Sequence, residues 1–447
     1  MYNFINKTLI LLLFAIGSLT SCEEFLDAKP SKDLVVPETI SDFRAILNSS
    51  DMNLDVMLTL VASGEYYTTK GNWDGYLPWQ QRAYLWQEDV FQIGDLVNDY
   101  SFPYIMIFNA NVVLESLERV EAPEHELLAL RGAALFYRAY GYYNLTQLFL
   151  PIVNQSSTYP DAFIPLKLLA SITEKPQKGN IQMVLSQMEN DLQEAISLLP
   201  EESTYPIQPN KVSSHALLAR IYLSQQQYEE AGFHADKVLE LKSTLIDYNE
   251  IDPLPNFPFR IFNDEVLFHS RMLANSRITR SLLSIIDNNL YAEFDENDLR
   301  RALYFTVNPA GNINFSGSYS GDSDLFSGLA TNEMYLISAE CKARIGNIQE
   351  ALDRINELLR HRWKQNTYQN LETESGQEVL KFILNERKKE LIFRGTRWAD
   401  LKRLNTEEEF AVVLNRELED ETYTLLPNSP NYIFPIPPDQ LLLEDFQ

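Results

Sequence analysis

The sequence is poor in the residues that most often carry chemistry. Its 447 residues include two cysteines and five histidines. No histidine stands with another histidine, a cysteine or a carboxylate at the spacing that places metal ligands on one helix face. There is also no Walker loop, no dinucleotide-binding fingerprint and no nucleophile elbow. The sequence therefore predicts no metal centre, no cofactor and no catalytic residue.

Basic residues are scarce as well. Lysine and arginine total 37 against 63 aspartates and glutamates, which gives a formal net charge of -26. A surface this acidic repels nucleic acids and anionic lipid headgroups, so we expect no nucleic-acid partner. With 45% hydrophobic and 22% charged residues, the composition is that of a globular protein with a large core.

Long apolar runs are confined to the N-terminus. Lys7 precedes an apolar run from Leu9 to Ile16, and Leu19-Thr20-Ser21-Cys22 ends it. This pattern predicts a signal peptide over residues 1–21. Cys22 is either incidental or, because the L-T-S-C order resembles a lipobox, the lipidated first residue of the mature protein. In the second case Cys341 is the only thiol left, and we expect it to be a buried filler in a helix.

Helical periodicity dominates the rest of the chain. The folded part begins at Ile40 to Leu47, after a tether from Glu23 to Pro37 that we expect to be extended. Residues 131–150 carry aromatic and aliphatic side chains on most sides of a long helix, which indicates burial among other helices, and Pro151 ends it. Residues 181–200 form a second helical pattern that we expect to pack against the first.

Two later segments show the helix-pair pattern of a tetratricopeptide repeat. The repeat has positions that require small residues and positions that take larger ones. Ala219, Tyr228 and Ala231 occupy them in one segment, and Ala339, Gly346, Ile348 and Ala351 occupy them in the other. Small residues at these positions let paired helices approach closely. The sequence thus predicts a mainly α fold with helix pairs around 127–200, 211–242 and 330–362, long irregular insertions and few short strands.

Residues 379–404, VLKFILNERKKELIFRGTRWADLKRL, predict a helical corner. Apolar residues recur at three-, four- and seven-residue intervals up to Ile392, with charged residues between them. Gly395 then supplies the tolerance of positive φ that a chain often needs on leaving a helix. Arg397 begins a second helical pattern.

The charged residues of this corner allow two interpretations, acid/base machinery or a satisfied internal ion-pair network. They are Glu386, Arg387, Glu390, Arg397, Asp400 and Arg403. Arginine forks bind carboxylates in a fixed plane and therefore suit the locking of two helices. Because no histidine, cysteine or serine with a plausible base stands nearby, we assign the corner to the scaffold.

The pattern E-R-x-x-E-L-x-F-x-G-x-R-W-x-D-L-x-R, from Glu386 to Arg403, closely resembles the C-terminal motif of the SusD/RagB family. Weaker matches follow the family's order along nearly all of the mature chain. The resemblance implies one SusD-like domain over 22–447, with 376–447 as its C-terminal motif region. Arg394 departs from the pattern, because the position before the glycine is commonly acidic in the family, and one ion pair is therefore in question.

Members of this family are surface lipoproteins that capture nutrients for a TonB-dependent transporter. The resemblance implies a lipoprotein held on the outer face of the outer membrane through Cys22, where it binds oligosaccharides and delivers them to a SusC-like TonB-dependent partner without acting as an enzyme. Glu23 and Glu24 resemble the family's acidic surface-export signal. Two alternatives stay open: a helical glycoside hydrolase or lyase, because carboxylates are abundant, and a tetratricopeptide-type envelope adaptor.

Three of the five tryptophans fall within residues 65–91. Helix breakers between 71 and 78 predict a loop there. Sugar rings stack on aromatic planes, and their hydroxyls bind amides and carboxylates. We therefore place the glycan site at rings held out from the body with polar partners beside them: Trp73, Tyr76 and Trp79, with Asn72, Asp74 and Gln80. Tyr84, Trp86 and Phe91 are assigned to the core. A second stretch, 308–326 with Phe315 and Tyr319, is either another site or a mobile loop.

Overall fold

The computed structural model describes residues 37–171, 173, 175–273 and 284–443. The predicted signal peptide, Cys22 and the predicted tether except Pro37 lie outside these residues. The chain divides into two units, 1–39 and 40–447, and all elements named below belong to the second. Within the described ranges, no helix is both long enough and apolar enough to cross a membrane.

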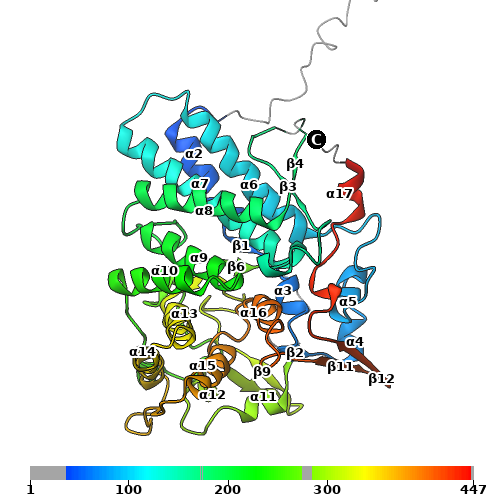
Figure 1. Cartoon of the computed structure of the whole chain (residues 1–447), viewed down its shortest axis with the longest axis vertical. Helices are drawn as coiled ribbons and strands as arrows, with labels where there is room; N and C mark the ends of the chain where they lie inside the picture. The colour runs from blue at the N-terminus through cyan, green and yellow to red at the C-terminus, as the bar shows by residue number, and fades with distance from the viewer. Residues whose placement is uncertain (1–36, 172, 174, 274–283, 444–447) are drawn as a thin grey trace, which may run out of the picture. The chain divides into compact units, whose positions relative to one another are not determined.

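Long helices packed on their sequence neighbours form the first half of this unit. They are α6 (Asn98–Leu117), α7 (Glu124–Phe149), α8 (Ile181–Leu198), α9 (Lys211–Ser224) and α10 (Tyr228–Leu241). Each packs on the next in chain order, and Figure 1 shows α7, α8, α9 and α10 one below another. Helix α7 packs on α6 and α8. This agrees with the prediction that the helix at 131–150 is enclosed by other helices and pairs with the helix at 181–200.

Close approach of α6 to α7 depends on one glycine. A Cβ at Gly141 would lie 2.8 Å from Cγ1 of Ile107 and 2.9 Å from the carbonyl oxygen of Pro103, both in α6. Those distances are shorter than van der Waals contact allows, so any larger side chain at position 141 would push the two helices apart.

The second half adds α13 (Thr331–Arg344), α14 (Ile348–Arg360), α15 (Gly376–Glu390) and α16 (Arg397–Leu404). Helix α13 packs on α10, α14 and α15. The segments with the tetratricopeptide pattern are thus the helix pairs α9/α10 and α13/α14. Cys341 lies buried where α13 meets α10, 3.0 Å from the position that a Cβ of Gly232 would take, as expected for a filler. The predicted mainly α fold is confirmed.

Shorter helices occupy the segments between the long ones. They are α2 (Ile40–Leu47), α3 (Leu58–Val61), α4 (Lys70–Trp73), α5 (Pro78–Tyr84), α11 (Asn288–Ala292), α12 (Arg300–Leu303) and α17 (Pro438–Leu443), with 3₁₀ turns at Ser50–Asn53, Val153–Gln155, Tyr248–Glu250 and Pro430–Tyr432. Asp99 of α6 accepts hydrogen bonds from the backbone N–H groups of Met57 and Leu58 and so caps the start of α3.

The strands are few and short, as predicted. One sheet of four antiparallel strands has the order β2-β7-β9-β8, from Tyr66–Tyr67, Ile285–Ile286, Ile313–Phe315 and Phe305–Val307. The other strands form pairs: parallel β1 (Leu54–Asp55) with β6 (Arg271–Met272), and antiparallel β3 (Ile164–Leu166) with β4 (Gln177–Gly179), β5 (Val266–Phe268) with β10 (Leu329–Ala330), and β11 (Leu414–Leu418) with β12 (Glu421–Leu425).

The predicted corner joins α15 to α16. Gly395 has φ +75°, as expected for a residue that lets the chain leave the helix. The sequence did not indicate that Phe393 also has positive φ, at 60°; the backbone N–H of Phe393 donates to Oε1 of Glu65 at 3.1 Å, which holds it there. Lys402 of α16 is buried and donates to the carbonyl groups of Thr146, Gln147 and Leu150, which would otherwise lack donors at the end of α7.

Five of the corner's charged residues form a buried ion-pair network, which agrees with the assignment of the corner to the scaffold: Glu386, Arg387, Glu390, Asp400 and Arg403. Arg300 of α12 binds both Glu386, at 2.6 Å, and Glu390, at 3.1 Å. Arg387 and Arg403 each reach Asp400 at 2.9 Å. The guanidiniums hold the pKa values of Glu390 and Asp400 below their usual range although burial alone would raise them.

Candidate ligand-binding site

The segment predicted as an aromatic loop is folded into two short helices. Residues 70–73 form α4, which includes Gly71, and residues 78–84 form α5, which begins at Pro78; Gly75 lies between them. Thr69 caps α4 by accepting from the N–H of Asn72, and Pro78 sits at the first position of α5, where its missing N–H is not needed. The loop prediction was wrong because Gly71 and Asn72 fit within the single turn of α4, while Asp74 and Gly75 lie between the helices and Pro78 begins α5.

Two of the three rings predicted to be exposed are buried. Tyr76 is 5% and Trp79 is 3% exposed. Trp79 packs against Phe91, with 6.1 Å between ring centroids, and Tyr76 packs edge-on against Tyr84 at 6.2 Å. Gln80 is also buried, and its side-chain oxygen accepts from the N–H of Leu77. The turn between the helices directs these side chains inward, so their predicted exposure was wrong.

The remaining members of the predicted site lie on α4 and reach the surface. Asp74 is exposed, and Asn72 and Trp73 are partly exposed. The indole N–H of Trp73 donates to the carbonyl of Gln81 at 3.4 Å, and the ammonium of Lys70 lies 5.0 Å from the indole centroid. Lys70 also pairs with Asp74. We call this surface, formed by Lys70, Asn72, Trp73 and Asp74, the α4 patch.

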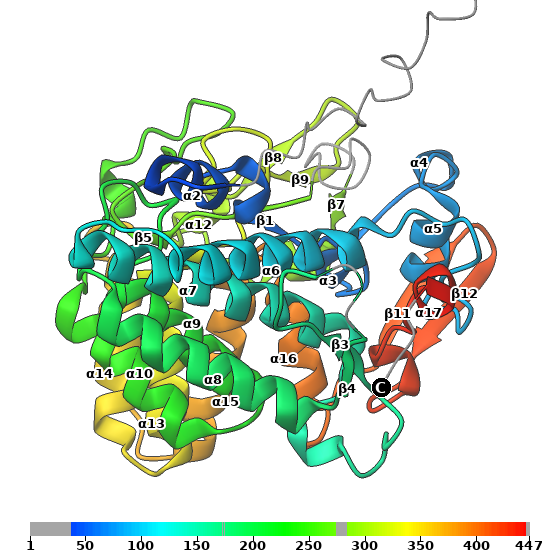
Figure 2. The same ribbon diagram turned by 90° about the horizontal axis from the view of Figure 1, so that it is seen from above.

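The core assignment of Tyr84, Trp86 and Phe91 is confirmed, since all three are buried. The sequence did not indicate what they pack against. Arg416 of β11 stacks on Tyr84 at 3.7 Å and on Trp86 at 4.4 Å, and it donates to the carbonyl groups of Tyr84 and Val61. Figures 1 and 2 show α4 and α5 beside the β11–β12 hairpin. The C-terminal hairpin therefore supports the aromatic segment.

The second stretch singled out in the sequence, 308–326, is not an open aromatic loop. It contains β9 of the four-stranded sheet, and its rings Phe315 and Tyr319 are buried. The hydroxyl of Tyr319 donates to Glu265 at 2.8 Å. These rings belong to the core and are not exposed for stacking on a sugar.

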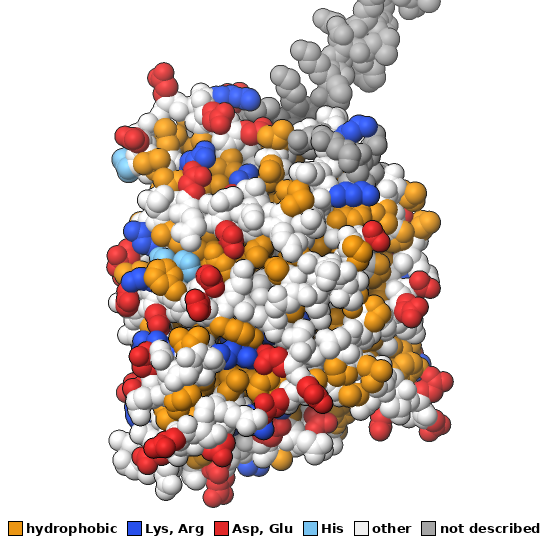
Figure 3. Space-filling model, in the orientation of Figure 1, with side chains coloured by type: hydrophobic (Ala, Val, Ile, Leu, Met, Phe, Trp, Pro, Cys, Tyr) orange, Lys and Arg blue, Asp and Glu red, His pale blue; other side chains and the backbone are white. Residues whose placement is uncertain are grey.

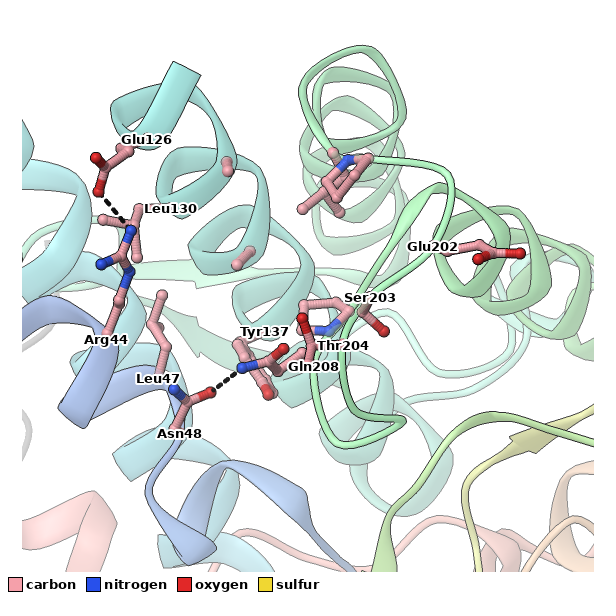
Figure 4. Close-up of a pocket in the computed structure, with 15 residues that line it drawn as sticks. Arg44, Leu47, Asn48, Glu126, Leu130, Tyr137, Glu202, Ser203, Thr204 and Gln208 are labelled. Atoms are coloured by element: carbon pink, nitrogen blue, oxygen red, sulfur yellow. Dashed lines mark hydrogen bonds and ion pairs between the residues drawn. The ribbon is translucent and has the colours of Figure 1, made fainter. Parts of the chain in front are cut away.

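A cleft of about 230 Å³ opens between α2, α7 and the segment 199–209. Figure 4 shows Arg44 and Leu47 of α2, and Asn48 just after this helix, facing Leu130 and Tyr137 of α7, with Gln208 closing one side. Gln208 donates to the side-chain oxygen of Asn48 at 3.2 Å, and Arg44 pairs with Glu126 across the opening.

The cleft combines an apolar floor with a polar rim. Leu47 and Leu130 are buried, while the rim carries amides, hydroxyls, one guanidinium and the carboxylates of Glu126 and Glu202. Such a lining suits a small polar organic ligand. Sequence reasoning missed it because its residues come from three distant segments and form no motif; the only signal was the Pro- and Ser-containing stretch after Leu199.

Perturbed carboxylates are a usual sign of acid/base chemistry, but Glu65 and Asp99 are enclosed. Burial raises the pKa of Glu65 to about 7 and that of Asp99 to about 6. Glu65 accepts from the backbone of Phe393 and from Ser63, and Asp99 accepts from two backbone N–H groups of α3. Both are buried and hold the backbone in place.

The fold brings together two histidines that the sequence showed no reason to pair. Nδ1 of His215 in α9 lies 2.8 Å from Nδ1 of His234 in α10, and burial lowers the pKa of each to about 4. No third histidine, cysteine or carboxylate joins them, because the described part of the chain contains no group of three or more such residues that could hold a metal ion.

Comparison with known proteins agrees with this architecture. Residues 24–223 match the family described as starch-binding and associating with the outer membrane, and residues 331–443 match the one described as the SusD family. The SusD-like protein P2 of Formosa agariphila is 24% identical over 361 residues, which cover 67% of this chain and 70% of that protein.

Solved structures show the same fold. A SusD superfamily protein from Bacteroides thetaiotaomicron superposes with a TM-score of 0.72 and 20% identity, covering 91% of this chain and 98% of its own. A laminarin-binding SusD-like protein gives a TM-score of 0.64 with 17% identity, over 91% and 98% of the two chains.

Stacked helix pairs joined to a helical corner with a buried ion-pair network define a mainly α, helical-repeat fold. Together with the two family matches, they identify its lineage: the chain belongs to the SusD/RagB family.

Proposed function

We propose that this protein is a nutrient-binding lipoprotein of the outer-membrane surface that binds oligosaccharides without cleaving them and passes them to a SusC-like TonB-dependent transporter. The observation that carries this proposal is family membership, since the family matched over 24–223 is described as starch-binding and associating with the outer membrane. The laminarin-binding relative of the same fold supports a glycan as the ligand class.

The α4 patch is the ligand-contacting surface in this proposal, with Trp73, Asn72 and Asp74 as its contacts. Tyr76 and Trp79 are buried, and their packing against Tyr84 and Phe91 supports α4 and α5 from the core side. The exposed Lys70–Asp74 pair contributes about 0–1 kcal/mol to stability. A sugar ring can therefore displace the ammonium from the indole face at small cost, and both charged groups then become available to sugar hydroxyls.

Calorimetry with a panel of plant and host oligosaccharides tests the ligand and the site. If the best ligand stacks on Trp73, Trp73→Ala should weaken its binding by about three- to tenfold, the equivalent of roughly 0.7–1.4 kcal/mol. Phe233→Ala, which truncates an exposed ring on α10, is the matched control and should bind like wild type.

Two other outcomes would contradict parts of the proposal. Unchanged binding by Trp73→Ala together with lost binding by Asn48→Ala would move the site to the cleft between α2 and α7. Cleaved products would indicate the hydrolase or lyase alternative. Affinity purification of the full chain from membranes solubilised in mild detergent tests the partner, and recovery of no barrel-sized protein would favour the envelope adaptor.

A further inference from the structure

Arg394, in the turn between α15 and α16, is a buried cation without an acidic partner. The residue is 5% exposed, and no carboxylate of the described residues lies within ion-pairing distance. Other buried arginines of this region differ, because Arg220, Arg300 and Arg403 each bind at least one carboxylate. A buried charge that lacks a counter-ion is unfavourable unless another group compensates it.

Two aromatic rings compensate this charge only in part. The guanidinium carbon lies 4.7 Å from the ring centroid of Tyr319 and 4.2 Å from that of Phe326. Contact with aromatic rings is favourable for a cation, but hydrogen bonds to the guanidinium are made in its own plane. There, both Nε and Nη2 are buried without an acceptor.

Nε and Nη2 form the edge of an arginine on which two parallel N–H groups bind one anion. Two further buried polar atoms without partners belong to residues around the same rings: Nδ1 of His269 and Oγ of Ser320. The ring of His269 lies 5.4 Å from that of Phe326, and Ser320 follows Tyr319 in the chain. Asp324 forms its ion pair with Arg271, at 2.5 Å, and not with Arg394.

The backbone at this place is also constrained. Phe393, the residue before Arg394, has φ +60°, and Gly395 after it has φ +75°. Positive φ is costly for a residue with a bulky side chain and persists only where the surroundings impose it. The turn therefore holds Arg394 under the two rings although this leaves its paired N–H groups without an acceptor.

We propose that Nε and Nη2 of Arg394 bind a small inorganic anion of the halide class, chloride under ordinary conditions. A halide supplies the negative charge that water lacks. It also needs no open cleft, in contrast to a carboxylate carried by an oligosaccharide. This site lies apart from the proposed α4 patch and does not depend on glycan binding.

Anion-dependent unfolding tests the site. Urea unfolding of the mature chain is followed in sodium chloride, sodium bromide and sodium gluconate at matched ionic strength. At a halide concentration ten times its dissociation constant, the unfolding equilibrium constant of wild type should fall roughly tenfold relative to gluconate. Arg394→Met should show no difference among the three salts.

Arg301→Met is the matched control, because Arg301 also stacks on a tyrosine, at 4.7 Å from Tyr291, yet donates to the carbonyl of Phe294 at 3.2 Å. It should keep the halide response of wild type. An equal halide response in wild type and Arg394→Met, or none in wild type, would overturn the proposal. If Arg394→Met fails to fold, anomalous diffraction from wild-type crystals soaked in bromide decides: a peak in contact with Nε and Nη2 supports the site, and none there refutes it.

Discussion

Replacing Glu390 by glutamine tests the buried ion-pair network most directly. Oε1 of Glu390 accepts from Nε of Arg362 and from Asn332, each at 2.8 Å, while Oε2 accepts from Arg300 at 3.1 Å. Glutamine keeps the shape but removes the charge, and its NH₂ group must face one of the two guanidiniums. Removing one partner of a buried ion pair typically costs about 3–5 kcal/mol.

The other contacts of the network place the expected value at the lower end of that range. Arg362 keeps Glu265 at 2.7 Å, and Arg300 keeps Asp298 and Glu386. Neither guanidinium is left without a carboxylate. We therefore expect Glu390→Gln to lower the free energy of unfolding by about 3 kcal/mol at pH 7, measured by urea unfolding.

The effect of the substitution should shrink in acid. Because the two arginines hold the pKa of Glu390 below its usual value against the effect of burial, the carboxylate stabilises the wild type above the unfolded-state pKa of about 4.3. That contribution is lost as the pH falls through the lower folded-state pKa, so wild type and variant should converge there.

The control is Glu357→Gln, which removes the charge of a surface pair with Arg360 whose side chains are 44% and 47% exposed. Such pairs contribute about 0–1 kcal/mol. If Glu390→Gln lowered the free energy of unfolding no more than Glu357→Gln does at pH 7, the network would not have the stabilising role that its geometry indicates.

Two further substitutions test the anchor and the end of α7. Cys22→Ala should release folded protein from the membrane fraction, and an unchanged distribution on cell fractionation would contradict lipidation at Cys22. Lys402→Met should lower the free energy of unfolding by about 1–3 kcal/mol, because three carbonyl groups lose their donor. Lys381→Met, which changes an exposed side chain, is the control and should change the free energy of unfolding little. Equal effects of the two substitutions would refute the role of Lys402 at the end of α7. Burial lowers the pKa of Lys402 to about 7, whereas the unfolded chain keeps that proton up to about pH 10.4. Wild-type stability should therefore rise with pH between these values through this group, and the variant should lack the rise.

Periodic patterns predicted the helices well because burial of one helix face leaves a direct trace in the sequence. The pattern at 181–200 corresponds to α8, and the small residues around Ala219 and Ala339 mark α9 and α13. The ion pairing of the corner was also predictable from the sequence, since acids and arginines that alternate beside apolar residues usually pair with one another. Each of these features is determined by residues close to one another in the sequence, so it can be predicted from the sequence.

The surface was less predictable because exposure depends on contacts between distant segments. Tyr76 and Trp79 resemble exposed loop residues until the turn between α4 and α5 directs them inward, toward Tyr84 and Phe91. The cleft at Asn48 and Gln208 joins residues 160 positions apart. The departure of Arg394 from the family pattern put one ion pair in question, but the sequence did not indicate that this arginine is buried.

The C-terminal motif also has a structural role at the aromatic segment. Glu65, just before β2, accepts from the N–H of Phe393 in the corner, and Arg416 of β11 stacks on Tyr84 and Trp86 while donating to the carbonyl of Val61. Two C-terminal contacts thus fix the segments on both sides of α4. Because α4 itself has one turn and would not persist alone, its position depends on these contacts, and a weakened corner should disturb the α4 patch even though it lies outside the ion-pair network.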